Sequence, residues 1–237
     1  MVTGASRRIG ASIVRHLHGG NMHLIVHFNR SSAEASDLVA ELCDIRPASA
    51  SLLEGDLRDM ERMTFSLRET VNRLGRLDVL VNNASAFFPT PLGKTTDANW
   101  QDIMDTNLKA PYFLSQAAAP YLQKTAGSIV NIVDIYAERP LPSHPVYSAS
   151  KAGLLSLTRS LAMELGPDVR VNSVSPGAIL WPENDYDELS HQRMISRTPL
   201  KRTGAPEDIA SAVQYLVDAD YVTGQNINVD GGRSVYP

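Results

Sequence analysis

The stretch "TGASRRIG", from Thr3 to Gly10, lies between a short apolar segment and a segment with helical spacing. Gly4 permits a tight turn, and Gly10 allows a helix to pack closely against a strand. The free N–H groups and the positive dipole end of such a helix suit a pyrophosphate. The stretch therefore predicts a dinucleotide-binding turn, although a glycine turn before a helix can also be purely structural. Only Met1, Val2 and Thr3 precede the turn at Gly4, where a central strand is expected, so we expect that upstream residues are missing from this chain.

Strand-like and helix-like segments alternate along the rest of the chain. Short segments rich in Val, Ile and Leu predict strands at residues 1–3, 23–28, 50–54, 77–81, 128–133, 170–174 and 226–229. Helical spacing of Ala, Leu and charged residues predicts helices at residues 8–18, 31–46, 60–74, 97–122, 147–165 and 206–217. These repeated units favour a single α/β domain over residues 1–237, a Rossmann-type doubly wound parallel sheet of about seven strands with helices on both faces.

Composition and charge narrow the class of protein. The 237 residues, 43% hydrophobic and 20% charged, are ordinary for a globular domain with a sizeable core. A formal net charge of -4 argues against a nucleic-acid or anionic-membrane partner, and no apolar run is long enough to span a bilayer. The single cysteine, Cys43, excludes an intrachain disulfide and agrees with a reducing compartment, so we expect a cytoplasmic protein. No His, Cys and Asp cluster has metal-ligand spacing, so we expect no metal.

Three irregular stretches follow the ends of predicted strands. They cover residues 85–96, 137–145 and 177–203. Ligands bind at the carboxyl ends of strands in open α/β sheets, so we expect all three stretches to border one site. The longest, at residues 177–203, is the predicted substrate loop, because long loops in compact domains are often functional.

The end of the second strand, "HFNRS" from His27 to Ser31, predicts the cofactor. It lacks the carboxylate that usually holds the ribose diol of NAD. Arg30 and Ser31 instead suit a 2′-phosphate, and Arg7 and Arg8 add positive charge nearby. We therefore predict NADPH. Asp56, at the end of the third strand, either reaches the adenine or caps the next helix.

Tyr147 and Lys151 form a candidate acid–base pair. They are spaced i, i+4, so they share one face of a helix. A lysine ammonium near a tyrosine favours the phenolate and lowers the tyrosine pKa, which suits proton transfer to a substrate during hydride transfer. Asp134 ends the apolar strand 128–133, where a charge is costly unless it is paired or protonated. It either passes a proton, with a raised pKa, or caps the following turn.

Several motifs together resemble the short-chain dehydrogenase/reductase family. "TGASRRIG", "NNAS" (residues 82–85), "YSASK" (147–151), "SPGAI" (175–179) and the tail "DYVTGQNINVDGG" (220–232) match that family in order, over nearly the whole chain. Two residues depart from it. The family usually has glycine at the position of Arg8, and serine thirteen residues before the catalytic tyrosine, at the position of Asp134. That serine orients a substrate carbonyl in most of the family.

Both departures resemble the pteridine reductase branch, as do "HFNRSSAEA" (residues 27–35), "NNASAFFPTPL" (82–92) and "VDIY" (133–136). This resemblance implies that Phe87 stacks on a pterin and sandwiches it against the nicotinamide. It places Ser85 beside the cofactor and the pterin edge, and Arg8 at a cofactor phosphate and the pterin. The alternative for Phe87 is simple loop packing. Trp181 either roofs the pocket or covers apolar surface.

The same resemblance implies roles for the polar residues. Asp134 and Tyr147 deliver the proton, Lys151 holds the nicotinamide ribose and tunes Tyr147, and Asn107 supports the lysine through water. We expect His144 to be a surface loop residue rather than a catalyst. The predicted cofactor-binding residues are Gly4, Ser6, Arg7, Arg8, Ile9, His27, Asn29, Arg30, Ser31, Asp56, Leu57, Asn83, Ala84, Ser85, Lys151, Pro176 and Gly177.

These observations predict an NADPH-dependent pteridine reductase acting on a dihydropterin, with biopterin and folate as further substrates. One alternative is a carbonyl or 3-oxoacyl reductase of the same family, which would tolerate Asp134 poorly. Another is a non-catalytic, cofactor-binding regulatory protein, which would be expected to lack Tyr147 or Lys151. The family is commonly tetrameric, so we expect a homotetramer assembled through helices 97–122 and 147–165.

Overall fold

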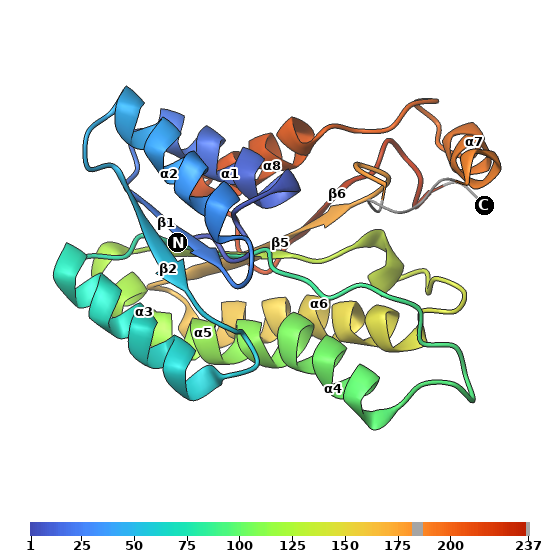
Figure 1. Ribbon diagram of the computed structural model, residues 1–237, viewed down its shortest axis with the longest axis horizontal. Helices are drawn as coiled ribbons and strands as arrows, with labels where there is room; N and C mark the ends of the chain where they lie inside the picture. Colours follow the sequence, from blue (N-terminus) through green and yellow to red (C-terminus); the bar gives the residue numbers. More distant parts are fainter. Residues whose placement is uncertain (182–186, 236–237) are drawn as a thin grey trace.

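A parallel β-sheet covered by helices on both faces forms the framework of the computed structural model, which describes residues 1–181 and 187–235 (Figure 1). β1 pairs with β2, and β3, β4, β5 and β6 pair in that order, all in parallel. Most residues of β1, β3, β4 and β5 are buried, as their apolar sequences predict. The strands are β1 (Leu24–Phe28), β2 (Ala50–Glu54), β3 (Val79–Asn82), β4 (Ser128–Ile132), β5 (Arg170–Pro176) and β6 (Asn226–Val229).

Residues 1–3 join the two groups of strands into one sheet. Val2 forms parallel bridges to Val26 of β1 and Val81 of β3. Its N–H donates to the carbonyl of Ile25 over 3.0 Å, and the N–H of Val81 donates to the carbonyl of Met1 over 2.9 Å. The described residues thus contain six strands rather than about seven. The expected first strand is reduced to bridges at Val2, because the turn at Gly4 leaves too few residues for a ladder.

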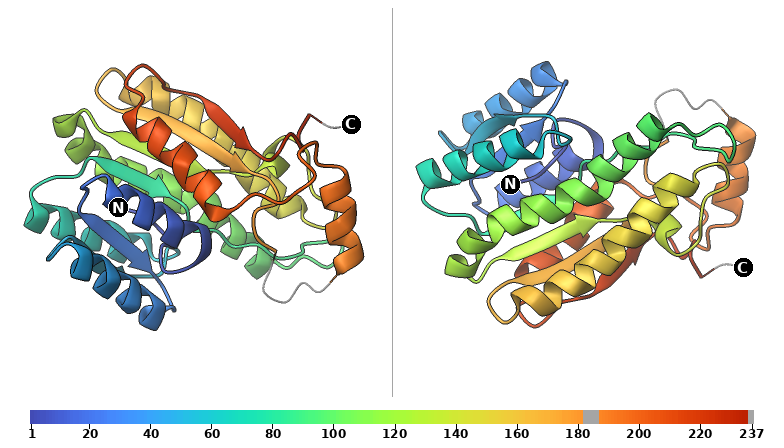
Figure 2. Two further views of the ribbon diagram at one scale, coloured as in Figure 1. Left: turned by 90° about the horizontal axis from the view of Figure 1, so that it is seen from above. Right: turned by 90° about the horizontal axis from the view of Figure 1, so that it is seen from below.

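Helices cover the two faces of the sheet as distinct layers (Figures 1 and 2). One layer contains α1 (Arg8–Gly19), α2 (Ser32–Ile45) and α8 (Pro206–Asp218), and the other contains α3 (Met60–Leu74), α5 (Ala110–Leu122) and α6 (Pro145–Leu165). The remaining helical segments are α4 (Asp97–Met104), the π-helix η1 (Asp105–Lys109), the short 3-10 segments η2 (Gln123–Thr125) and η3 (Ile135–Ala137), and α7 (Glu188–Ser196).

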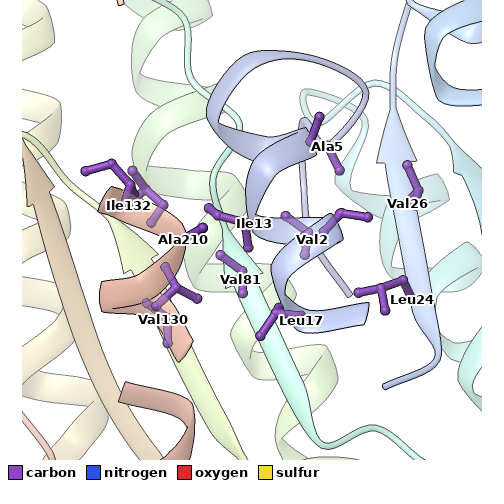
Figure 3. Packing of buried hydrophobic residues seen from close by; sticks show 14 of the residues in the cluster. Val2, Ala5, Ile13, Leu17, Leu24, Val26, Val81, Val130, Ile132 and Ala210 are labelled. Carbon is purple, nitrogen blue, oxygen red and sulfur yellow. The ribbon is translucent and has the colours of Figure 1, made fainter. Parts of the chain in front are cut away.

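Two hydrophobic clusters, one on each face, hold these layers to the sheet. In the first, Ile13 and Leu17 of α1 pack on Val2, Val81 and neighbouring strand residues (Figure 3). The second cluster joins β3 and β4 to α3, α5 and α6. Each fully buried Val, Leu or Ile contributes about 1.5–3 kcal/mol relative to an exposed one. The core therefore fixes the sheet whose carboxyl edge carries the loops.

Two helical features differ from the sequence prediction. The segment expected as one helix over residues 97–122 is divided into α4, η1 and α5. α7 lies within the stretch 177–203 that was expected to be irregular. α7 contains no buried residue, so it lacks the apolar spacing that marks a helix in the sequence. Its start is instead fixed by Asp187, whose side chain accepts a hydrogen bond from the N–H of Ser190.

No helix in the described parts of the chain is both long and apolar enough to cross a membrane.

Candidate active site

The carboxyl ends of β1, β2 and β3 and the start of α1 surround a groove of about 540 Å³. It brings together most of the predicted cofactor residues. It adds five residues that the predicted set lacks, which are Gly10, Phe28, Arg58, Asp102 and Thr106. Lys151, Pro176 and Gly177 are not among its lining residues. The predicted residues that do line it are Gly4, Ser6, Arg7, Arg8, Ile9, His27, Asn29, Arg30, Ser31, Asp56, Leu57, Asn83, Ala84 and Ser85.

The glycine turn leaves the start of α1 open to a ligand. Gly4 has a φ of 58°, and a Cβ at this position would lie 2.8 Å from the Cα of Ala84. A Cβ on Gly10 would collide with the carbonyl oxygen of Gly4. The Asn83 side chain holds the turn by donating to the carbonyls of Thr3 and Gly4 over 2.9 and 3.0 Å. α1 has no side-chain cap and no acidic residue in its first turn, so its N–H groups and dipole suit a phosphate.

Arg8 occupies a backbone conformation that favours glycine. Its φ is 55°, which costs roughly 1–2 kcal/mol for a residue with a Cβ. Its guanidinium crosses to the loop after β5, where it donates to the carbonyls of Leu180 and Trp181 over 3.3 and 2.9 Å. Arg8 therefore connects the glycine turn to the beginning of the predicted substrate loop.

Both ring nitrogens of His27 are hydrogen-bonded to the backbone of the protein, so neither is free to bind a ligand in the groove. Its Nδ1 accepts from the N–H of Gly4, and its Nε2 lies 3.1 Å from the carbonyl oxygen of Gly55, so Nε2 carries the proton and donates. Burial lowers the pKa of His27 to about 4, so the ring is neutral. His27 therefore fixes the turn relative to the end of β2.

In the part of the chain that the structure describes, some arginine side chains at the groove contact a carboxylate of the protein, and Arg30 does not. Arg7 lies 3.8 Å from Glu34. Arg58 binds Asp56 through a contact of 2.6 Å and reaches Asp102 over 3.2 Å, and its hydrogen bonds lower the pKa of Asp56 to about 2. Within the described residues, Arg30 forms no hydrogen bond or ion pair. Its guanidinium is thus available to an anionic ligand at the mouth of the groove.

The structure excludes one of the two interpretations of Asp56, and the adenine contact stays a prediction. The residue that caps α3 is Asp59, whose carboxylate accepts from the N–H of Arg62 over 3.1 Å. Asp56 lies three residues too early to cap that helix and binds Arg58 instead. The capping alternative is therefore wrong, and Asp56 is one of the residues that line the groove.

Asp134 and Tyr147 form a short hydrogen bond beside the groove. The Tyr147 hydroxyl donates to Oδ2 of Asp134 over 2.7 Å. The other oxygen, Oδ1, accepts from the N–H of Tyr136 over 2.8 Å and so caps η3. Asp134 therefore caps the following turn with one oxygen and accepts the Tyr147 hydrogen bond with the other, and its role in proton transfer stays a prediction.

Lys151 lies deeper than the tyrosine and faces the end of β4. It is 2% exposed, and its Nζ donates to the carbonyl of Ile132 over 2.9 Å. Burial lowers the pKa of Lys151 to about 8, and the charge of Asp134 acts in the opposite direction. The ammonium lies 5.8 Å from the centre of the Tyr147 ring. The predicted pair therefore shares one helix face, as expected, without a hydrogen bond between its members.

The direction of the Tyr147 pKa shift is opposite to the sequence prediction. Burial raises the pKa of Tyr147 well above its usual value, and the charge of Asp134 and the hydrogen bond to it raise it further. A hydrogen bond with Ser85 acts in the opposite direction. Burial also raises the pKa of Asp134, as predicted for a carboxyl in an apolar setting. Tyr147 is therefore a protonated donor to Asp134, and Lys151 does not make it a phenolate in this arrangement.

Asn107 lies in the π-helix η1 and is fully buried. Its Oδ1 accepts from the N–H of Ala86 over 2.7 Å and from the Ser85 hydroxyl over 3.3 Å. Its Nδ2 donates to the carbonyl of Ala86 over 3.0 Å and to the Ser150 hydroxyl over 3.1 Å. Asn107 thus ties the loop after β3 to α6, the helix that carries Tyr147 and Lys151.

Phe87 lies directly beside the candidate catalytic tyrosine. Its ring centre is 4.7 Å from that of Tyr147, at an interplanar angle of 81°. It also stacks on His144, with ring centres 4.8 Å apart and planes 8° apart. His144 lies in a loop, as expected, but its contact with Phe87 was not predicted. Trp181 stacks on His191 of α7, with ring centres 3.8 Å apart, and its role over the pocket stays a prediction.

Comparisons with known proteins place this arrangement in a family. A family model described as enoyl-(acyl carrier protein) reductase matches residues 4–234. The chain belongs to the short-chain dehydrogenase/reductase family. A 3-oxoacyl-[acyl-carrier-protein] reductase FabG of Staphylococcus aureus is 36% identical over 98% of this chain and 96% of the relative. Pteridine reductase 1 of Leishmania tarentolae is 35% identical over 99% of this chain and 96% of the relative.

These short-chain dehydrogenase/reductase relatives identify the chain as an oxidoreductase. Their names divide between acyl-carrier-protein and pteridine reductases, and identities of 36% and 35% do not separate the two activities. Reductases of this family use NAD(P)H. The groove fits such a dinucleotide, because the open start of α1 suits the pyrophosphate and the turn at Gly4 has no room for a side chain. Within the described residues, no group of three or more His, Cys, Asp and Glu residues is placed to hold a metal.

Proposed function

We propose that the protein is an NADPH-dependent pteridine reductase that transfers hydride to a dihydropterin, with biopterin and folate as further substrates. The observation that carries this proposal is the 2.7 Å hydrogen bond from Tyr147 to Asp134. A carboxyl group at this position suits proton delivery to a ring nitrogen better than it suits carbonyl reduction.

The argument concerns where charge develops during the reaction. Reduction of a carbonyl generates negative charge on oxygen, which is stabilised by hydrogen-bond donors. A carboxylate beside that oxygen would oppose this charge. Reduction of a ring C=N bond instead requires hydride at carbon and a proton at nitrogen. A carboxyl and a phenol in one hydrogen-bonded pair can supply that proton.

The chain's own residues are arranged for this transfer. Tyr147 carries the hydroxyl proton, which it donates to Asp134 over 2.7 Å in this structure. Burial raises the pKa of Asp134, which brings proton uptake at this carboxyl closer to neutral pH. For the transfer, Asp134 takes up a proton from solvent, and the Tyr147 hydroxyl turns its own proton to the substrate nitrogen. Asp134 then returns its proton to the phenolic oxygen. The buried ammonium of Lys151 limits the negative charge that accumulates on the pair.

The groove supports NADPH as the reductant. When it is bound, NADPH supplies the hydride. Arg30 and Ser31 would hold its 2′-phosphate, and the start of α1 would hold its pyrophosphate. Phe87 supports a planar substrate, because the residue is 44% exposed and its ring stands edge-on to that of Tyr147.

The second candidate is a 3-oxoacyl reductase, and the Staphylococcus aureus relative at 36% identity favours it. This activity would have to proceed with a carboxyl group in place of a carbonyl-orienting hydroxyl. The non-catalytic alternative has less support, because Asp134, Tyr147 and Lys151 are all present. Tyr147 is hydrogen-bonded to Asp134, and the Lys151 ammonium lies 5.8 Å from the centre of the Tyr147 ring.

The deciding experiment measures NADPH consumption with dihydrobiopterin, dihydrofolate, a panel of ketones and 3-oxoacyl thioesters. We expect turnover of the pterin. Asp134→Asn should lower its kcat by about 100-fold or more, which is the scale of general acid–base catalysis, with little change in NADPH affinity. Asp134→Ser is the matched variant, because it introduces the hydroxyl that suits carbonyl chemistry. Turnover of only the carbonyl substrates would remove the proposal, and near-normal pterin reduction by Asp134→Asn would remove Asp134 from the mechanism.

A further inference from the structure

Two loops from distant parts of the chain meet beside Tyr147. One follows β3 and contains Phe87 and Thr90, and the other precedes α6 and contains Ser143 and His144. The N–H of Thr90 donates to the carbonyl of Ser143 over 2.7 Å. The Thr90 hydroxyl accepts from the N–H of Val146 over 3.3 Å, and Thr90 is only 1% exposed. This buried clamp fixes the two loops relative to each other.

The two loops also meet through aromatic rings. The imidazole of His144 covers one face of Phe87, at 4.8 Å between ring centres and 8° between planes. Phe87 nevertheless remains 44% exposed, so ring surface is left for a planar ligand. The edge-on contact with Tyr147 sets the orientation of that surface relative to the proton donor.

His144 is itself held in one orientation. Its Nδ1 lies 2.9 Å from the carbonyl oxygen of Pro142, so this nitrogen carries the proton and donates. The preceding residue, Ser143, has a φ of 61°, a conformation uncommon for a residue with a Cβ. The N–H of Leu141 donates to the Ser148 hydroxyl over 3.1 Å, which binds this loop to the first turn of α6. The imidazole is thus positioned by the helix that carries Tyr147.

We propose that His144 is a positioning residue that fixes the ring plane of Phe87 and thereby selects flat heteroaromatic substrates. The inference rests on the proposed pteridine reductase function. An exposed phenylalanine without a second ring behind it samples several rotamers, and a ligand that stacks on it must then order the side chain. Stacking on His144 orders the ring before the ligand arrives. Phe87 would contact the substrate equally in the ground and transition states, so its order should affect KM more than kcat.

The test compares His144→Ala, which removes the second ring, with His144→Phe, which keeps a flat ring at the same position. The measurements are KM and kcat for dihydrobiopterin and the Kd of oxidised biopterin in the presence of NADP⁺. We expect His144→Ala to raise KM and Kd by about 3- to 10-fold, the range of an aromatic pair, with kcat changed by less than about 2-fold. His144→Phe should remain within about 2-fold of the parent protein in all three quantities.

Two results would overturn the inference. One is an unchanged Kd and KM in His144→Ala. The other is an equal loss in His144→Phe, which would show that the hydrogen bond to Pro142, rather than the ring face, is what matters. Hydrogen exchange of residues 86–90 in the free protein supplies a readout that needs no pterin, and it should be faster in His144→Ala only. Measurements on the parent protein separate failure of the proposed function from failure of this inference. If the proposed function is wrong, the parent protein will neither bind biopterin nor reduce dihydrobiopterin.

Discussion

Arg30 should determine the choice between NADPH and NADH. It lines the groove, and within the described part of the chain it has no hydrogen-bonding or ion-pair partner. A charge-assisted hydrogen bond to a phosphate is worth about 1.5–3 kcal/mol. Arg30→Ala should therefore raise the Kd of NADPH by roughly 10- to 100-fold and that of NADH by less than about 2-fold.

Calorimetric titration of both cofactors measures this effect, and Arg7→Ala is the matched control. Arg7 lies near the same mouth but pairs with Glu34, so its removal should change the preference less. Equal losses of NADPH and NADH affinity in Arg30→Ala would show that another residue recognises the 2′-phosphate.

His27 should make the folded protein sensitive to acid. Burial lowers the pKa of its imidazole from the usual 6.5 to about 4. Between these values the unfolded chain binds a proton that the native protein does not, so the native state loses stability as pH falls. The contribution of His27 is complete above pH 6.5 and is lost progressively down to about pH 4. The full loss amounts to roughly 3 kcal/mol, from the free energy that corresponds to one pKa unit.

Urea unfolding of the parent and of His27→Gln between pH 7 and pH 4 tests this linkage. The variant lacks the titrating ring, so its free energy of unfolding should fall less over this range by roughly the same 3 kcal/mol. It should also be less stable at pH 7, because the hydrogen bonds to Gly4 and Gly55 are disturbed. His16→Gln, on the exposed side of α1, should keep the parent's pH dependence. An unchanged pH dependence in His27→Gln would contradict the prediction.

The residue-level chemistry was only partly predictable from the sequence. The spacing of Tyr147 and Lys151 correctly indicates one helix face, and the short distance in sequence from Asp134 to Tyr147 suggests a shared site. Spacing does not reveal that the Tyr147 hydroxyl points at the Asp134 carboxylate. That contact, together with burial, reverses the expected shift of the Tyr147 pKa. The direction of such a shift depends on side-chain orientation, which periodicity does not encode.

At the scale of elements, the π-helix η1 should be essential for the loop after β3. A π-helical turn interrupts α-helical register and is frequent at functional sites. Here it turns Asn107 toward both the N–H and the carbonyl of Ala86. Asn107→Ala would leave these groups without a protein partner and should lower the free energy of unfolding by about 1–3 kcal/mol.

Ser150→Ala provides the comparison, because it removes only one of the four hydrogen bonds of Asn107. It should cost about 1 kcal/mol or less in urea unfolding. Asn107→Ala should also speed hydrogen exchange at residues 85–87, whereas Ser150→Ala should not. A loss in Asn107→Ala no larger than that in Ser150→Ala would mean that the loop holds its conformation without the amide.

Elements with an apolar pattern or with turn residues at their ends were predicted well, and α7, which has neither signal, was missed. The predicted limits of α3, β2 and β6 agree with the structure, because burial imposes periodicity on their sequences or turn residues bound them. α7 contains no buried residue and rests on an N-terminal cap, so its sequence resembles a loop. The division of α4 and α5 by η1 leaves helical spacing almost intact and is therefore invisible to a periodicity argument.

At the scale of the whole molecule, the fold was predictable but the substrate was not. Repeated strand–helix units lead to one sheet, and most of the predicted cofactor residues lie together at the carboxyl ends of its strands. The same fold serves relatives with both acyl-carrier-protein and pteridine substrates. We therefore propose that substrate choice depends on a few side chains at the sheet edge, chiefly Asp134, Phe87 and His144.

We predict that the chain forms a homotetramer in which α5 and α6 pack against the same helices of a second copy. Figure 2 shows these helices side by side on one face, where no other element of the described chain covers them. A mainly apolar groove of about 480 Å³ lies between α6 and the chain that runs from the end of α4 through η1 to the start of α5. It contains Leu108, Tyr112 and Leu157. Met163 and Phe113 add exposed apolar surface on the same two helices. Such a surface is typical of an interface between identical subunits.

Light scattering should give a mass near four times that of the 25.9 kDa chain. Ser156→Glu places a charge in the groove without disturbing the isolated subunit, because Ser156 is exposed. We expect this variant to dissociate to dimers or monomers, since an unpaired charge buried in an interface is strongly unfavourable. Ser36→Glu, on the exposed face of α2 in the opposite layer, should keep the parent mass. A monomeric parent, or a Ser156→Glu variant with the parent mass, would show that these helices do not form the interface.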